Sequence, residues 1–129
     1  MTSIPFPARR ATILVVDDDA LITLNLADQL AELGHVALEA YSGREALTLL
    51  QTRSDIQLLV TDFSMPGMNG VELIEAAHGL YPGLPVLLTS GYAELPEGVG
   101  ADYPRLEKPF REDELIRRVD ELLADTASI

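Results

Sequence analysis

Short apolar segments alternate along the chain with longer segments in which apolar residues recur at helical spacing. The short segments predict strands at residues 13–16, 36–40, 57–61, 85–89 and 105–107. The longer segments predict amphipathic helices at residues 20–33, 43–53, 70–79 and 112–124. Buried strands that alternate with helices are typical of an α/β fold, in which a doubly wound parallel sheet carries helices on both faces.

Several predicted helix ends carry capping signals. Asp19 is a candidate N-cap of the first helix, and Gly34 follows that helix as a glycine that can end it. Ser42 stands before the second helix with Glu45 three residues later, which predicts a capping box. The predicted boundaries therefore rest on local chemistry as well as on periodicity.

Composition narrows the class of protein. A chain of 129 residues with 47% hydrophobic residues is expected to form one domain with a core of its own. Nine Lys and Arg against 21 Asp and Glu give a net charge of −12, which disfavours nucleic acid or an anionic membrane as the main partner. The absence of cysteine excludes disulfides, thiolate metal sites and cysteine nucleophiles.

The chain divides into a predicted flexible leader at residues 1–11, a domain at residues 12–125 and a short tail at residues 126–129. No apolar run reaches the length that spans a bilayer. The first residues lack the long apolar core of a signal peptide, so we expect a cytoplasmic protein without a membrane partner.

Polar residues with chemical potential follow the predicted strands. Asp17 and Asp18 come after the first strand, Asp62 after the third, Ser90 after the fourth and Lys108 after the fifth. Ligands of such sheets bind beyond the carboxyl ends of the strands. If the first and third strands are neighbours, their carboxylates repel one another unless a cation lies between them, and an all-oxygen site suits Mg²⁺. Lys108 and Ser90 would complete a cradle for a phosphoryl group.

Each of these features also has a simpler explanation. An aspartate after a strand often caps the next helix, which is a sufficient role for Asp19. A Thr-Ser-Gly sequence or a Lys-Pro pair often marks no more than a turn. Their joint occurrence at the ends of successive strands favours a functional site.

Four segments resemble the receiver domain of two-component response regulators, and the resemblance extends from about residue 12 to residue 124. The matching segments are residues 13–19 (ILVVDDD), 61–70 (TDFSMPGMNG), 88–91 (LTSG) and 107–110 (EKPF). The resemblance implies a flavodoxin-like sheet of five parallel strands in the order 2-1-3-4-5. It also implies that Asp62 accepts the phosphoryl group, that Lys108 pairs with that group and that Ser90 is the switch hydroxyl.

The same resemblance implies a metal site and a partner. Asp17, Asp18, Asp62 and the backbone carbonyl of Ser64 would hold Mg²⁺, for which Mn²⁺ could substitute. The phosphoryl donor would be a phosphohistidine of a histidine kinase or a histidine phosphotransfer domain, and phosphorylation would change the interaction surface. Such a domain catalyses only its own phosphorylation and dephosphorylation. The sequence leaves open the cognate kinase, the output and the oligomeric state.

Two other functions are compatible with parts of the pattern. A phosphatase similar to the haloacid dehalogenase group would use Asp17 and Asp19 as a D-x-D motif, but Leu21 stands where that group has threonine. A receiver-like binding module that is never phosphorylated would not need the complete set of site residues that this chain has.

Two departures from the receiver pattern concern the switch. Arg105 occupies the position where the family usually has an aromatic residue, so we expect it to face solvent or to pair with Glu94 or Asp102. The stretch before it contains Pro96 and Gly98 among other helix breakers, and its helix is expected to be short, displaced or frayed. Residues 88–93 and 104–109 resemble receivers of hybrid sensor histidine kinases, so the chain is either a stand-alone receiver or a piece of a longer protein.

Overall fold

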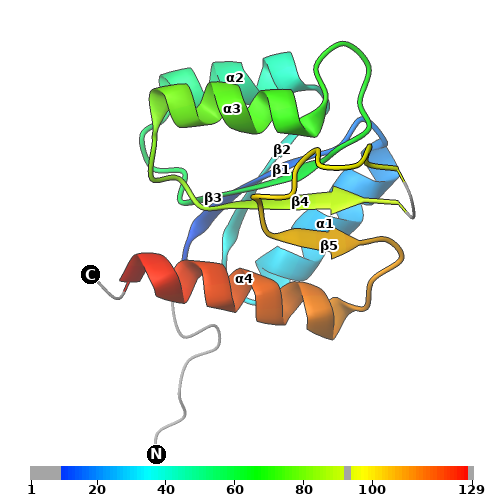
Figure 1. Cartoon of the computed structure of the whole chain (residues 1–129). Coiled ribbons are helices and arrows are strands. Elements are labelled where there is room, and N and C mark those ends of the chain that lie inside the picture. Colours follow the sequence, from blue (N-terminus) through cyan, green and yellow to red (C-terminus); the bar gives the residue numbers. More distant parts are fainter. Residues whose placement is uncertain (1–9, 92–93, 128–129) are drawn as a thin grey trace, which may run out of the picture.

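Strands and helices alternate through the part of the chain that the structure, a computed structural model, describes: residues 10–91 and 94–127 (Figure 1). The strands are β1 (Thr12–Val16), β2 (Val36–Ala40), β3 (Leu58–Asp62), β4 (Val86–Ser90) and β5 (Arg105–Glu107). The helices are α1 (Ala20–Glu32), α2 (Gly43–Thr52), α3 (Gly70–Leu80) and α4 (Glu112–Ala127). All these elements were expected from the sequence, with boundaries that differ by a few residues.

The strands form one parallel sheet. Its order is β2-β1-β3-β4-β5, which confirms the predicted flavodoxin-like arrangement. Because β1 and β3 are neighbours, with Val16 opposite Thr61, the residues that follow them leave the same edge of the sheet side by side. The carboxyl ends of all the strands therefore face a common site.

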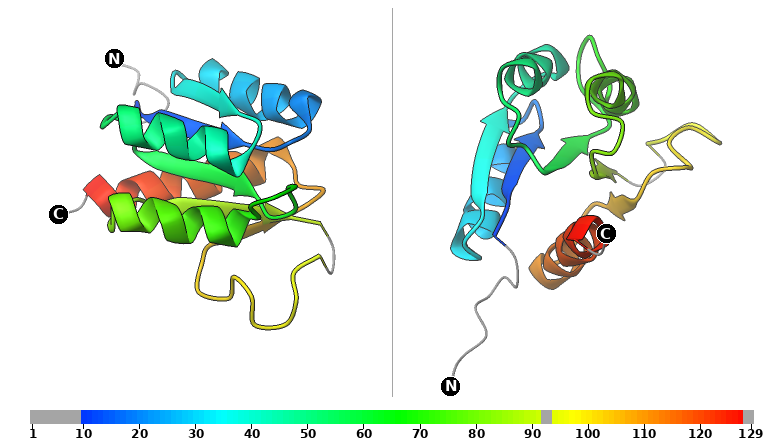
Figure 2. Two further views of the ribbon diagram at one scale, coloured as in Figure 1. Left: turned by 90° about the horizontal axis from the view of Figure 1, so that it is seen from above. Right: turned by 90° about the vertical axis from the view of Figure 1, so that its left-hand side faces the viewer.

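Helices cover both faces of the sheet, with α2 and α3 on one side and α1 and α4 on the other (Figures 1 and 2). The side chains of β1 alternate between these layers. Leu14 and Val16 belong to the apolar cluster under α2 and α3, whereas Ile13 and Val15 belong to the cluster under α1 and α4. This alternation explains why β1 is apolar at consecutive positions: both of its faces are buried.

Helix ends follow the predicted chemistry in part. Asp19 caps α1, since its carboxylate accepts hydrogen bonds from the N–H groups of residues 21 and 22. Gly34 ends the same helix at a φ of 101°, where a residue without a Cβ is least strained. The capping box predicted at Ser42 is only half formed, because the Glu45 carboxylate bonds to the N–H of Tyr41 instead.

The ends of the domain differ slightly from the predicted boundaries. Residues 1–9 of the predicted leader lie outside the described residues, while Ala11 is buried and its N–H donates a hydrogen bond to Nδ1 of His35. Helix α4 continues to Ala127, past the expected start of the tail. No helix in the described ranges combines the length and the apolar character that crossing a membrane requires.

The connection from β4 to β5 contains turns and no helix across residues 94–104, in agreement with the expected weakness of a helix there. This segment, yellow in Figure 2, loops out at one side of the molecule. It is better anchored than its sequence indicates. Leu95 and Tyr103 pack against the apolar cluster, and a Cβ on Gly100 would lie 3.0 Å from Leu88.

Candidate functional site

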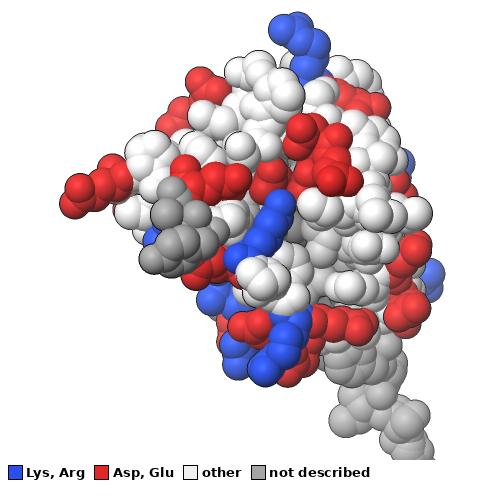
Figure 3. Space-filling model, turned by 90° about the vertical axis from the view of Figure 1, so that its right-hand side faces the viewer, with Lys and Arg blue, Asp and Glu red and all other residues white. Residues whose placement is uncertain are grey.

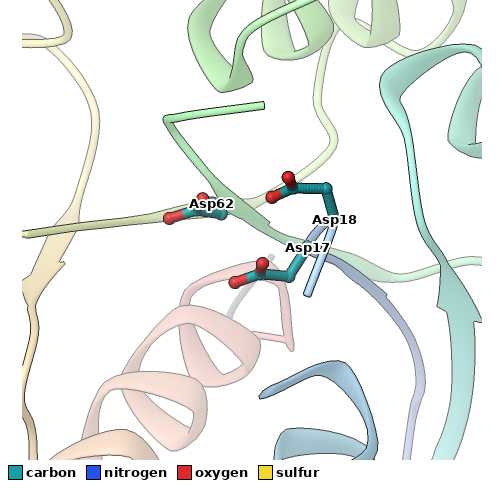
Figure 4. Close-up of side chains that lie close together, drawn as sticks. All are labelled: Asp17, Asp18 and Asp62. Atoms are coloured by element: carbon teal, nitrogen blue, oxygen red, sulfur yellow. The ribbon is translucent and has the colours of Figure 1, made fainter. Parts of the chain in front are cut away.

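Three aspartates converge at the carboxyl edge of the sheet. Asp17 and Asp18 follow β1, Asp62 ends β3, and each offers a carboxylate oxygen within 4.8 Å of the others (Figure 4). The parallel pairing of β1 with β3 produces this convergence of residues that are far apart in the sequence. The predicted neighbourhood of these three side chains is thereby confirmed.

Lys108, which follows the edge strand β5, contacts two of the aspartates. Its Nζ lies 2.9 Å from Oδ1 of Asp62 and 3.2 Å from Oδ2 of Asp17. The lysine follows β5, and its backbone N–H donates a 2.7 Å hydrogen bond to the carbonyl oxygen of Ser90. The peptide bond between Lys108 and Pro109 is cis. Lys108, like the aspartates, thus lies at the carboxyl ends of the strands, as expected from the sequence.

Burial and the neighbouring charges shift the pKa values of Asp62 and Lys108. Burial raises the pKa of Asp62, with a further contribution from Asp17, while the hydrogen bond and charge of Lys108 oppose the rise. Burial by itself would lower the pKa of Lys108, but contact with Asp62 and Asp17 outweighs it and the pKa is raised. The lysine therefore stays a cation beside an acid that holds its proton more tightly than a free carboxyl does.

The main chain and α1 hold Asp17 in place. Its Oδ1 accepts the N–H of Asp19 at 2.9 Å, and its carbonyl oxygen accepts the hydroxyl of Thr23 at 2.8 Å. Asp17 is 2% exposed, whereas Asp18 is exposed and directs its carboxylate toward Asp62 (Figure 4). Sequence reasoning did not identify Thr23; the available signal was a hydroxyl residue on the buried face of an amphipathic helix.

The start of α3 packs closely against the end of β3. The N–H of Gly70 donates a 2.8 Å hydrogen bond to the carbonyl oxygen of Phe63, and a Cβ on Gly70 would clash with the carbonyl oxygen of Asp62. Asn69 forms a complete capping box with Glu72 at the start of this helix. Glycine at position 70 thus lets α3 pack directly behind Asp62.

The remaining predicted residues surround this centre. Ser90 ends β4 and lines, together with Glu94 and Arg105, a pocket of about 270 Å³. Arg105 is exposed, as expected, and among the described residues it forms no ion pair. Ser64 is exposed in the loop after β3, and the role of its carbonyl as a metal ligand stays a prediction.

The donor set fits a hard divalent cation. The converging ligands are carboxylate oxygens, with no sulfur or imidazole among them, and this composition suits Mg²⁺ or Mn²⁺. Acidic side chains also gather over the face of the molecule that holds the strand ends (Figure 3). Asp19 is not part of the group, because its carboxylate caps α1.

Comparison with known proteins agrees with this geometry. The sequence model of one protein family, the response regulator receiver domain, matches residues 13–120 of this chain. The chain belongs to this family. Receiver domains act with histidine kinases in two-component signalling.

The receiver is similar both to single-domain proteins and to parts of longer ones. It is 34% identical to a chemotaxis protein CheY homolog of Campylobacter jejuni, over 86% of this chain and 91% of that protein. The structure of CheY4 of Vibrio cholerae has a TM-score of 0.80 at 28% identity, over 89% of this chain and 100% of that chain.

A third relative is much longer. The transcriptional regulatory protein GlrR of Escherichia coli K12 is 31% identical over 91% of this chain, which spans only 27% of that protein. Receivers thus occur within transcriptional regulators. The expectation that this protein has no nucleic-acid partner, which came from its acidic charge, is therefore not supported.

Proposed function

We propose that this receiver accepts a phosphoryl group on Asp62 from a phosphohistidine of a histidine kinase or a histidine phosphotransfer domain. The observation that supports this most strongly is the contact of Lys108 with Asp62 at 2.9 Å beside two further carboxylates. The domain would catalyse only its own phosphorylation and dephosphorylation, and the modified form would present a changed interaction surface.

The chemistry follows from the side chains at the sheet edge. A carboxylate oxygen of Asp62 attacks the phosphorus, an acyl phosphate bond forms, the P–N bond of the donor breaks, and the leaving imidazole takes up a proton. Mg²⁺ held by Asp17, Asp18, Asp62 and the Ser64 carbonyl would neutralise phosphoryl oxygens. Lys108 would shift from Asp62 to a phosphoryl oxygen, and the hydroxyl of Ser90 would donate a hydrogen bond to another.

Intact-mass measurement tests this proposal. The protein is incubated with Mg²⁺ and either acetyl phosphate or phosphoramidate, whose P–N bond resembles that of phosphohistidine. We expect one phosphoryl group per chain in the wild type, and none in Asp62→Asn or after EDTA treatment. An adduct that persists in Asp62→Asn would place the acceptor elsewhere.

Two further variants separate the alternatives. Lys108→Ala should still bind Mg²⁺ but show smaller amide shifts on addition of beryllofluoride, a phosphoryl analogue; equal shifts would refute the role of the lysine. Turnover of a phosphomonoester that is lost in Asp17→Asn but kept in Asp62→Asn would instead indicate a phosphatase of the haloacid dehalogenase type.

A further inference from the structure

Glu94 forms two hydrogen bonds with Gly91, the residue that follows β4. Its carboxylate accepts the backbone N–H of Gly91 at 2.9 Å, and its own N–H donates to the carbonyl oxygen of Gly91 at 3.2 Å. A Cβ on Gly91 would lie 3.7 Å from Cδ and Oε2 of Glu94, so the carboxylate covers this glycine. Glu94 therefore holds the main chain directly beside Ser90.

The same carboxylate lies close to the strand end that carries Asp62. Asp62 is opposite Thr89 in the pairing of β3 with β4, and Ser90, the next residue of β4, lines one pocket together with Glu94. A phosphoryl group on Asp62 would replace one negative charge with about two. Phosphorylation therefore increases the repulsion that acts on Glu94.

Arg105 supplies a cation to the same pocket. Arg105 and Glu94 both line the pocket of about 270 Å³ beside Ser90. None of the acidic groups in the described part of the chain forms an ion pair with Arg105. The guanidinium group presents paired donors that match a carboxylate, so a displaced Glu94 has a new partner within the pocket.

We propose that Glu94 is a positioning residue that couples the charge on Asp62 to the loop after β4. In the unmodified domain Glu94 bonds to Gly91; a phosphoryl group on Asp62 displaces its carboxylate, which then pairs with Arg105. This inference rests on the proposed function, because it takes Asp62 as the modified residue. It gives Arg105 a role in the switch, at the position where the family usually has an aromatic side chain.

Linkage between the two events makes the proposal measurable. If a phosphoryl group repels Glu94, then the charge of Glu94 weakens binding of a phosphoryl analogue by the same factor. Glu94→Gln removes the charge but keeps a side-chain oxygen that can accept the N–H of Gly91. At saturating Mg²⁺, this variant should bind beryllofluoride about three- to tenfold more tightly, the size expected for charges near a protein surface.

Nuclear magnetic resonance provides a readout that a purely structural role would not change. In the wild type, beryllofluoride should shift the backbone N–H signal of Gly91 and the Nε–H signal of Arg105. In Glu94→Gln, the shift at Arg105 should be lost while the shift at Lys108 persists. Arg105→Gln should reduce the shift at Gly91, and Arg105→Lys, which keeps a cation, should restore it.

Glu97→Gln is the matched control. Glu97 is an exposed glutamate of the same segment, so its substitution changes the net charge equally, and we expect neither the affinity nor the Arg105 signal to change. An equal gain of affinity in Glu97→Gln, or no change of affinity and signal in Glu94→Gln, would overturn the inference.

The same titration separates this inference from the proposed function. Failure of beryllofluoride to bind the wild type, or equal binding to Asp62→Asn, would overturn both. Binding that requires Asp62 but is indifferent to Glu94 would overturn only the coupling through Glu94.

Discussion

Within the described part of the chain, Asp18 forms no ion pair, unlike Asp17 and Asp62. Lys108 contacts Asp17 and Asp62, while the exposed carboxylate of Asp18 adds negative charge to the same group. The metal-free site is therefore crowded with like charges, and the third carboxylate is the one whose removal disturbs the lysine contacts least.

Asp18→Asn should accordingly weaken Mg²⁺ binding and stabilise the metal-free domain. We expect a loss of about 1–3 kcal/mol in Mg²⁺ affinity, the value of one charge-assisted contact. Thermal melting in EDTA should show a higher midpoint than in the wild type. Asp28→Asn, on the exposed face of α1, should change neither quantity, and a lower midpoint in Asp18→Asn would contradict the crowding.

His35 should make the stability of the domain depend on pH. Its Nδ1 accepts the N–H of Ala11 at 3.1 Å, and among the described residues its Nε2 has no hydrogen-bond partner. Burial lowers the pKa of His35, and the charge of Asp120 offsets this only in part. As pH falls from 6.5 toward the lowered pKa, the unfolded chain takes up a proton that the folded chain does not, so the free energy of unfolding decreases.

Urea unfolding from about pH 8 to about pH 5 measures this effect, since histidine is the side chain that ordinarily titrates in that range. His35→Gln, whose amide oxygen can accept the Ala11 N–H, should flatten the pH dependence. An unchanged slope in His35→Gln would assign the dependence to other groups.

At the scale of elements, the position of α3 depends on a single glycine. A Cβ added to Gly70 would clash with the carbonyl oxygen of Asp62 and would lie 2.9 Å from Cδ1 of Leu88. Gly79, in the same helix, has open space around it. Gly70→Ala should therefore destabilise the domain by about 1–3 kcal/mol through overpacking. Gly79→Ala should stabilise it by about 0.5–1 kcal/mol, because alanine favours helices. Chemical denaturation of both variants checks the contrast, which equal effects would refute.

The strands and most helix ends could be predicted because their causes are local. Apolar alternation, Asp19 and Gly34 act through residues that are neighbours in the sequence. The aspartates and Lys108 could also be placed, since a parallel sheet brings strand ends together. The contact of Gly70 with β3 could not be predicted, because it depends on how separate segments meet and no local pattern records this. Glu45 and Tyr41 are only four residues apart, but the capping-box pattern does not show that the carboxylate bonds to Tyr41 instead of Ser42.

Across the molecule as a whole, the segment between β4 and β5 is the expected site of change on activation. It contains no helix at residues 94–104, and it adjoins Ser90 and the pocket beside it. Segments without regular hydrogen bonding open locally at low free energy. Hydrogen exchange with and without beryllofluoride should show the largest change in protection at residues 91–106. Identical exchange there, with changes in α1 or α4 instead, would place the response elsewhere.

The distance along the chain between the parts of the site has a consequence for its synthesis. Lys108 follows Asp17 by 91 residues and Asp62 by 46. A ribosome therefore produces both acids and the sheet strands that carry them well before the lysine emerges. Any partial sheet that forms before β5 joins its edge would hold the carboxylates without the lysine that contacts them. If Lys108 acts as proposed, we expect the domain to accept a phosphoryl group only once translation has passed its last strand.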